Sequence, residues 1–133
     1  MAFPNGSGGY QVGDGNLGEP LFFMQSAPTA LTAAATATPA QLVNGLFTFN
    51  GTAGDLTLPT VADLEAAFSS MSEKVDSAFD FFVINIDGGT DDVTVAIGSG
   101  WTLVGAGQVD NGTSGHFRAR KTGVGTWTCY RVS

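Results

Sequence analysis

The sequence predicts a mainly β protein: an antiparallel β-sandwich or a barrel-like, jelly-roll-like body, with one short α-helix and an extended N-terminal arm. Apolar runs rich in Phe, Val and Ile recur between turns of Gly, Asn and Asp, which is typical of antiparallel sheets. One segment, residues 60–72, has the apolar repeat of a helix. The first 20 residues are rich in glycine and offer little apolar surface to offset the entropy of ordering.

The length of 133 residues suits one domain, so we divide the chain into an arm, residues 1–20, and a single β-rich domain, residues 21–133. Glycine loses more conformational freedom than other residues when it becomes ordered. We interpret four larger apolar side chains of the arm as contacts that order it against another subunit: Phe3, Tyr10, Val12 and Leu17. The alternative is a frayed chain terminus.

The first part of the domain contains short elements. Residues 21–26 are apolar and predict a strand. Pro39 suits the first position of a single helical turn, where its missing N–H is not needed. Residues 46–51 and 55–60 each place alternate apolar side chains on one face, and the Asn-Gly pair between them favours a β-hairpin.

The helix predicted over residues 60–72 has both a start signal and an apolar face. Thr60 suits the N-cap, and Asp63 lies in the first turn, where the helix dipole favours an acidic residue. Four apolar side chains then follow the helical repeat: Leu64, Ala67, Phe68 and Met71.

Two strands and a terminal hairpin complete the domain. Residues 78–87 form a nearly continuous apolar strand, and residues 93–97 alternate between apolar and other side chains. For the terminal hairpin we favour a loop over residues 122–126, because this register buries the most apolar surface. It places four side chains in the core: Phe117, Ala119, Trp127 and Cys129. A loop one residue shorter would instead put Arg118 and Arg120 on the face of Trp127.

Composition excludes several functions. The net charge of −7 disfavours nucleic acid, and no apolar run reaches the ~20 residues of a membrane span. The start of the chain lacks a secretory signal, and the single Cys129 suits synthesis in a reducing cytoplasm. Charged residues make up only 13% of the chain, so we expect much of its surface to be covered by self-association or by partners.

We predict no catalytic, cofactor or metal site. His116, Asp110 and Ser114 could suggest a hydrolase triad, but the exposed nucleophile turn of such enzymes is missing from the sequence. The acidic turn of Asp87, Asp91 and Asp92 could supply oxygen ligands for calcium, although ordinary turn chemistry explains it equally well. Whether this turn binds a cation stays open at this point.

Four of the five cationic side chains lie within residues 116–133, and none of the twelve acids does. Opposite charge on a partner would set the register and the rate of docking. We therefore take three of these side chains as interface candidates: Arg118, Arg120 and Arg131. The alternative is an ordinary solvated sheet face, where isolated ion pairs contribute little.

Several segments together resemble small virion proteins of tailed bacteriophages, notably marine and cyanobacterial ones. The most specific are LTLPT leading into the helix and the final RARKTG…TWTCYRV hairpin, within a similarity over most of residues 11–132. The resemblance implies a capsid decoration, or cement, protein that binds the outer surface of the mature head. Such a protein, often a homotrimer, clamps neighbouring subunits of the major capsid protein. The resemblance implies no catalytic residue.

Two other functions compete with this one. The first is a head-fibre or tail-fibre module that binds host surface glycans, for which an exposed Trp101 beside Asp110 and Asn111 could form the site. The second is an inner scaffold or a connector part of the virion.

Overall fold

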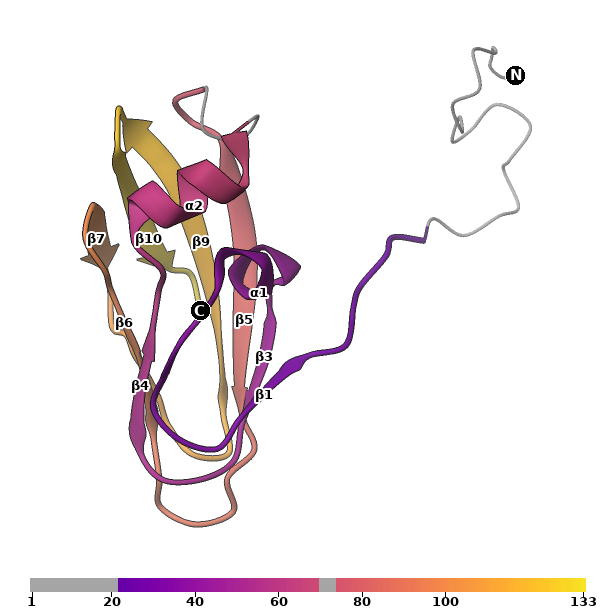
Figure 1. The fold of residues 1–133 in the computed structure, drawn as a ribbon. Helices are drawn as coiled ribbons and strands as arrows, with labels where there is room; N and C mark the ends of the chain where they lie inside the picture. Colours follow the sequence, from indigo (N-terminus) through magenta and orange to yellow (C-terminus); the bar gives the residue numbers. More distant parts are fainter. Residues whose placement is uncertain (1–21, 70–73) are drawn as a thin grey trace.

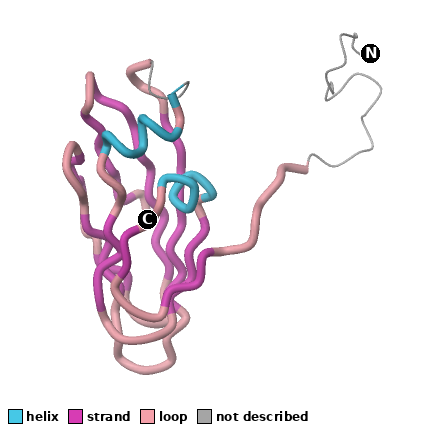
Figure 2. Tube along the Cα trace, in the orientation of Figure 1, coloured by secondary structure: helices cyan, strands magenta, loops and turns pink. Residues whose placement is uncertain are grey.

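The computed structural model describes residues 22–69 and 74–133, which are mainly β, as the sequence predicts. Two sheets face one another, with helices near one end and connecting loops at the other (Figure 1, Figure 2). The elements are β1 (Thr29–Leu31), β2 (Ala35–Thr36), α1 (Pro39–Asn44), β3 (Leu46–Phe49), β4 (Gly54–Thr57), α2 (Val61–Ala67), β5 (Ala78–Asn85), β6 (Val93–Ala96), β7 (Trp101–Val104), β8 (Gln108–Val109), β9 (Ser114–Gly123) and β10 (Thr126–Arg131). The predicted arm contacts Phe3, Tyr10, Val12 and Leu17 lie outside the described residues.

Both sheets are mixed, so the predicted antiparallel arrangement is wrong. The larger sheet has the strand order β1-β3-β5-β9-β10-β7, and the smaller one has the order β2-β4-β6-β8. Parallel pairing joins β1 to β3, β3 to β5, β2 to β4, β4 to β6 and β7 to β10. The reason is the path of the chain. From β1 to β6 each strand is followed by one in the other sheet, so the chain returns to the first sheet in its original direction.

The hairpin predicted over residues 46–60 is therefore wrong as well. β3 and β4 belong to different sheets, and the Asn-Gly turn between them carries the chain across the sandwich. This crossing loop stacks on the crossing between β1 and β2, because Thr52 N–H donates to Thr32 O over 3.1 Å. A Cβ atom at Gly51 would lie 2.0 Å from the same carbonyl oxygen. Glycine is required there by the close approach of two backbones.

The helical turn predicted at Pro39 is confirmed, because α1 begins at this residue. In α1 the Thr38 hydroxyl accepts from Gln41 N–H, and the Gln41 side chain accepts from Thr38 N–H, so that two free donors are satisfied. α2 begins as predicted, because the Thr60 hydroxyl accepts from Asp63 N–H over 3.2 Å. It ends at Ala67, where the backbone of Phe68 leaves the helical region with φ −132° and ψ 69°. Residues 70–72 of the predicted helix, with Met71, lie outside the described residues.

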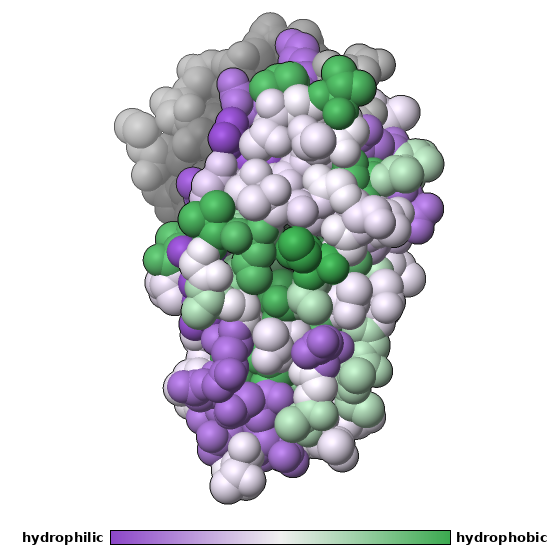
Figure 3. All heavy atoms as spheres, turned by 90° about the vertical axis from the view of Figure 1, so that its left-hand side faces the viewer, coloured by the Kyte–Doolittle hydropathy of each residue, from purple (hydrophilic) through white to green (hydrophobic). Residues whose placement is uncertain are grey.

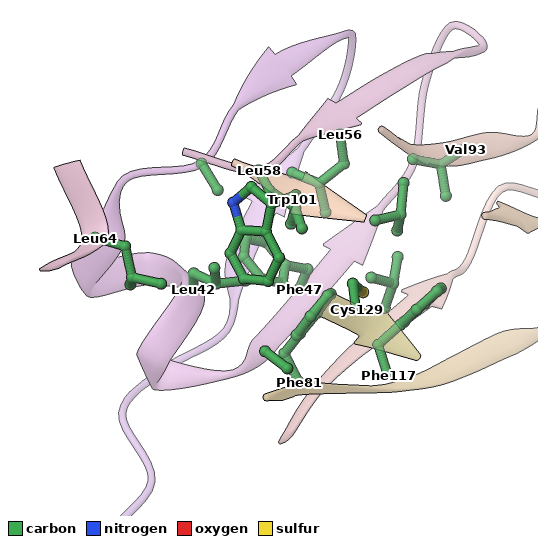
Figure 4. Packing of buried hydrophobic residues seen from close by; sticks show 14 of the residues in the cluster. Leu42, Phe47, Leu56, Leu58, Leu64, Phe81, Val93, Trp101, Phe117 and Cys129 are labelled. Carbon is green, nitrogen blue, oxygen red and sulfur yellow. The ribbon is translucent and has the colours of Figure 1, made fainter. Parts of the chain in front are cut away.

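The core lies between the two sheets and beneath both helices. Figure 4 shows Leu56 and Val93 of the smaller sheet pointing toward Phe81 and Phe117 of the larger one. The Phe81 and Phe117 rings stack with centroids 5.1 Å apart and planes 9° apart. Burying such large side chains is the main favourable term in the stability of the sandwich.

The C-terminal hairpin has the register that the sequence favours. Trp127 pairs with Lys121 and Cys129 pairs with Ala119, and a bulge next to Thr126 adds one further pair to the loop. The four apolar side chains predicted for the core are buried: Phe117, Ala119, Trp127 and Cys129. Arg118 and Arg120 lie on the opposite, outer face of the larger sheet, opposite Tyr130 and Thr128.

Candidate interaction surface

The outer face of the larger sheet carries an ionic cluster that joins β5 to β9. Asp80 pairs with Arg118 in the strand register, and its two oxygens accept from Arg118 Nε over 2.5 Å and from Nη2 over 2.9 Å. The same carboxylate lies 2.9 Å from His116 Nε2. The hydrogen bonds from Arg118, and then that from His116, lower the pKa of Asp80 to about 2. Asp80 is thus a carboxylate held between two donors of its own chain.

Arg120 is also bound within the chain. Its Nη1 donates to Asp76 Oδ1 over 2.7 Å, and its Nε and Nη2 donate to the Tyr130 hydroxyl over 3.2 and 2.8 Å. The guanidinium lies 5.7 Å from the centre of the Tyr130 ring. These hydrogen bonds, from Tyr130 first and Asp76 second, raise the pKa of Arg120.

The third interface candidate, Arg131, is hydrogen-bonded within the chain at the end of β10. Its Nη1 donates to the main-chain oxygens of Ala106 and Gln108 over 3.1 and 2.8 Å, and its Nε donates to Ser133 O over 2.7 Å. The guanidinium lies 5.1 Å from the centre of the Phe117 ring. This side chain ties the loop before β8 to the end of β10.

Lys121 completes the set of C-terminal cations and is buried. Its Nζ donates to Glu65 Oε2 of α2, and Trp127 Nε1 donates to the same oxygen over 3.0 Å. The hydrogen bond from Lys121 lowers the pKa of Glu65. All four C-terminal cations therefore have hydrogen-bond acceptors within the chain. Three of them pair with acids on α2 and on the segment around β5, and Arg131 binds main-chain oxygens instead.

A second feature of the outer face is apolar. Phe82 and Ile84 of β5, together with Ile86 just after it, point outward from alternate positions, and 36–55% of each is exposed. Leu46 of β3 pairs with Phe82 and is partly buried beside it. We call these four residues the apolar strip. The Phe82 ring also stacks on the His116 ring with centroids 4.4 Å apart, which joins the strip to the ionic cluster.

The segment that precedes β1 is more exposed than the strip. Phe22, Phe23 and Met24 are 84%, 85% and 97% exposed, and Figure 1 shows this segment leaving the sandwich. The predicted strand over residues 21–26 is absent from its described part, residues 22–26. The base of the segment is held at the end of α1, where Gln25 Nε2 donates to Asn44 O over 2.9 Å and to Asn44 Oδ1 over 3.0 Å.

The side of the sandwich formed by β6 and β7 is a third candidate surface. Figure 3 shows apolar side chains gathered across the middle of this side, with hydrophilic side chains below them. Ile97 follows β6 and Val104 ends β7, and both are exposed. β7 is an edge strand of the larger sheet. These apolar side chains come singly from different strands, whereas the apolar strip is a continuous row.

The acidic turn is organised by hydrogen bonds of its own. Asp87 Oδ2 accepts from Gly89 N–H and Asp91 N–H, and Asp92 accepts from Gln108 and Asn111. In the described part of the chain, no three His, Cys, Asp or Glu side chains are grouped so that they could hold a metal ion. The turn chemistry is thus sufficient to explain these carboxylates.

Sequence reasoning missed Asn85, which is buried at the end of β5. Its Nδ2 donates to Asp91 O over 3.0 Å and to Val109 O over 3.1 Å, and its Oδ1 accepts from Asp87 N–H over 3.0 Å. A signal was present in the sequence, because Asn85 continues the buried alternation of Phe81 and Val83 with a polar side chain.

The glycan site considered for Trp101 is wrong. Trp101 is buried, and its Nε1 donates to Pro59 O over 2.8 Å, so its ring cannot stack on a sugar.

Over residues 22–69 and 74–133 no pocket is found, and none of the helices there is long and apolar enough to cross a membrane. Of the three side chains considered above for a triad, His116 is paired with Asp80, and Asp110 accepts from Gln108.

Comparisons of this chain with protein-family models, with curated proteins and with solved structures found no match.

Proposed function

We propose that this chain is a capsid decoration, or cement, protein of a tailed bacteriophage. In this proposal it is made in the cytoplasm of the bacterial host and binds the outer surface of the mature head. It assembles as a homotrimer and clamps neighbouring subunits of the major capsid protein. The resemblance of LTLPT and of the final hairpin to phage virion proteins is the origin of the proposal.

The observation that carries the proposal is the exposed apolar surface of a chain with few charges. Phe22, Phe23 and Met24 project almost fully into solvent, and the apolar strip lies open on the larger sheet. Contiguous exposed apolar surface marks sites of macromolecular contact. A protein that assembles with its own copies on a shell has a use for such exposed apolar surfaces.

The proposed clamp gains strength from multivalency. Three copies joined in one body present three equivalent contacts, and the second and third contacts form at high effective concentration. Each contact can then be individually modest. The ionic pairs around Asp80 and Arg120 add rigidity to the sheet face that would meet the shell.

The test is binding to expanded, empty heads of the phage that encodes this chain. The protein is mixed with the shells, pelleted with them, and located by a cryo-EM difference map of decorated and bare particles. We expect density at local three-fold positions on the exterior. Density at a single vertex, inside the shell, or absent altogether would overturn the proposal.

A further inference from the structure

We propose that Phe22–Met24 of one copy docks on the apolar strip of a second copy, the strip being Leu46, Phe82, Ile84 and Ile86. The inference rests on the self-association in the proposed function and names the two surfaces that meet.

The donor is a short apolar segment held away from its own body. All three of its side chains are at least 84% exposed, so they make few contacts with the sandwich that carries them. Gln25 fixes the base of the segment to Asn44, and Asn44 Nδ2 donates in turn to Ala27 O over 3.2 Å. Three extended residues beyond this base reach about 10 Å. The segment is thus projected from a fixed point.

The receptor is a flat row of large side chains on the pleated face of β5. Phe82, Ile84 and Ile86 lie on one side at a spacing of two residues, and Leu46 adjoins the row from β3. The row is partly exposed along its whole length, so it can accept aromatic side chains without opening the core. His116 stacks on Phe82 at one end and gives the row a defined boundary.

The chemistry of the two surfaces matches. Residues 21–30 contain no charged side chain, and neither does the strip, so their contact desolvates no unpaired ion. An aromatic side chain buries roughly 150–250 Å². Two phenylalanines and a methionine therefore supply about half of the ~800 Å² that each partner buries in a specific interface. A copy that both donates its segment and accepts another doubles this area.

The contact joins different surfaces on the two copies, and such heterologous contacts generate rings when the rotation closes. In a ring of copies linked by exchanged segments, every segment is docked and every apolar strip is covered. A homotrimer is one such ring.

The experiment is disulfide trapping between two variants that each carry one introduced cysteine. Phe23→Cys and Ile84→Cys are made on separate full-length chains, one with an added tag that changes its mass, and the mixture is oxidised. The native Cys129 does not interfere, because it is fully buried and burial raises the pKa of its thiol to about 12. The matched control replaces Phe23→Cys by Val124→Cys, on an equally exposed side chain at the tip of the β9–β10 hairpin.

We expect the Phe23→Cys and Ile84→Cys chains to form the mixed dimer at least ten times faster than the control pair, since a disulfide needs Cβ atoms about 4 Å apart. Rates equal to the control would overturn the inference. A double variant carrying both changes tests the remaining possibility, docking within one chain. A cross-linked monomer at high dilution, with no mixed dimer, would also overturn it.

Shell binding is measured on the same samples. Shell binding without trapping would leave the proposed function standing and reject the exchanged segment. Trapping without shell binding would support the exchanged segment and reject the decoration function.

Discussion

The segment Phe22–Pro28 and the β9–β10 hairpin differ in whether their side chains find partners within the chain. The hairpin carries four cations, and each donates hydrogen bonds to acceptors within the chain. The segment carries no charge, and its three largest side chains are left in solvent. The hairpin is the more conspicuous feature of the sequence, yet most of its polarity is used in holding the sandwich together. The contrast gives charge a structural role and leaves apolar contact as the basis of the association that we propose.

The largest effect on the free energy of unfolding is expected at the buried ion pair of Glu65 and Lys121. Glu65→Ala leaves Lys121 buried without its partner, and we expect it to lower the free energy of unfolding by about 4 kcal/mol. Chemical denaturation followed by tryptophan fluorescence measures this, because the buried Trp127 and Trp101 become exposed to water on unfolding.

Asp63→Ala is the matched control, an exposed acid two residues earlier on α2. It should cost under about 1 kcal/mol, the range of a charge at a helix N-terminus. If both variants cost the same, the hairpin cations are not held by the internal pairs described here.

An intermediate effect is expected at Asp80. Its pKa is lowered to about 2 in the folded protein, below the ordinary 3.8, so the folded state releases its proton more readily than the unfolded chain. The resulting stability is present above pH 4 and is lost as the pH falls toward 2. Because the carboxylate is partly exposed, we expect Asp80→Asn to cost about 1 kcal/mol at pH 7 and to flatten this acid dependence.

Urea denaturation at pH 7, 4 and 2.5 supplies the measurement. Asp55→Asn serves as the control, since Asp55 is an exposed acid on β4. An acid dependence that persists unchanged in Asp80→Asn would mean that the ionic cluster does not contribute to stability.

Changes in the exposed segment Phe22–Met24 are expected to have the smallest effect on the free energy of unfolding and the greatest effect on self-association. The triple change Phe22→Ser, Phe23→Ser and Met24→Ser should alter the free energy of unfolding of the dilute protein by less than about 0.5 kcal/mol, because these side chains make few contacts in the body. Analytical ultracentrifugation should show loss of the self-associated form.

Val124→Ser removes an equally exposed apolar side chain from the hairpin tip and should leave association intact. A marked fall in the stability of the dilute triple variant would show that the segment belongs to the body, and the contrast between the two regions would fail.

Local features of the fold were predictable from the sequence. The cap at Thr60 and the register of the C-terminal hairpin both follow from neighbouring residues, through a side-chain acceptor in one case and the burial of Trp127 in the other. Strand direction was not predictable, because alternating apolar residues look the same in parallel and antiparallel pairs. Gly51 illustrates the difficulty, since a turn signal typical of a hairpin here serves the crossing between two sheets.

For the candidate surface, the sequence predicted the outward position of single residues but not which residues meet there. Arg118 was correctly placed on the outer face, but Asp80 is 38 positions away and meets it only through the register of β5 with β9. The apolar strip was concealed in a run whose two faces are both apolar, so the sequence could not separate its buried residues from its exposed ones. The alternative glycan site required an exposed Trp101, and the path of the chain buries this side chain instead.

The position of β10 governs when this protein can fold during its synthesis. β10 lies between β9 and β7, so the larger sheet stays split until residue 131 has left the ribosome. An unfinished chain lacks Trp127 and Cys129 in the core and exposes the open edges of two strands. Such edges invite pairing between nascent chains. We therefore expect the larger sheet to close only after β10 has emerged, with chaperones shielding the incomplete sheet until this strand is inserted.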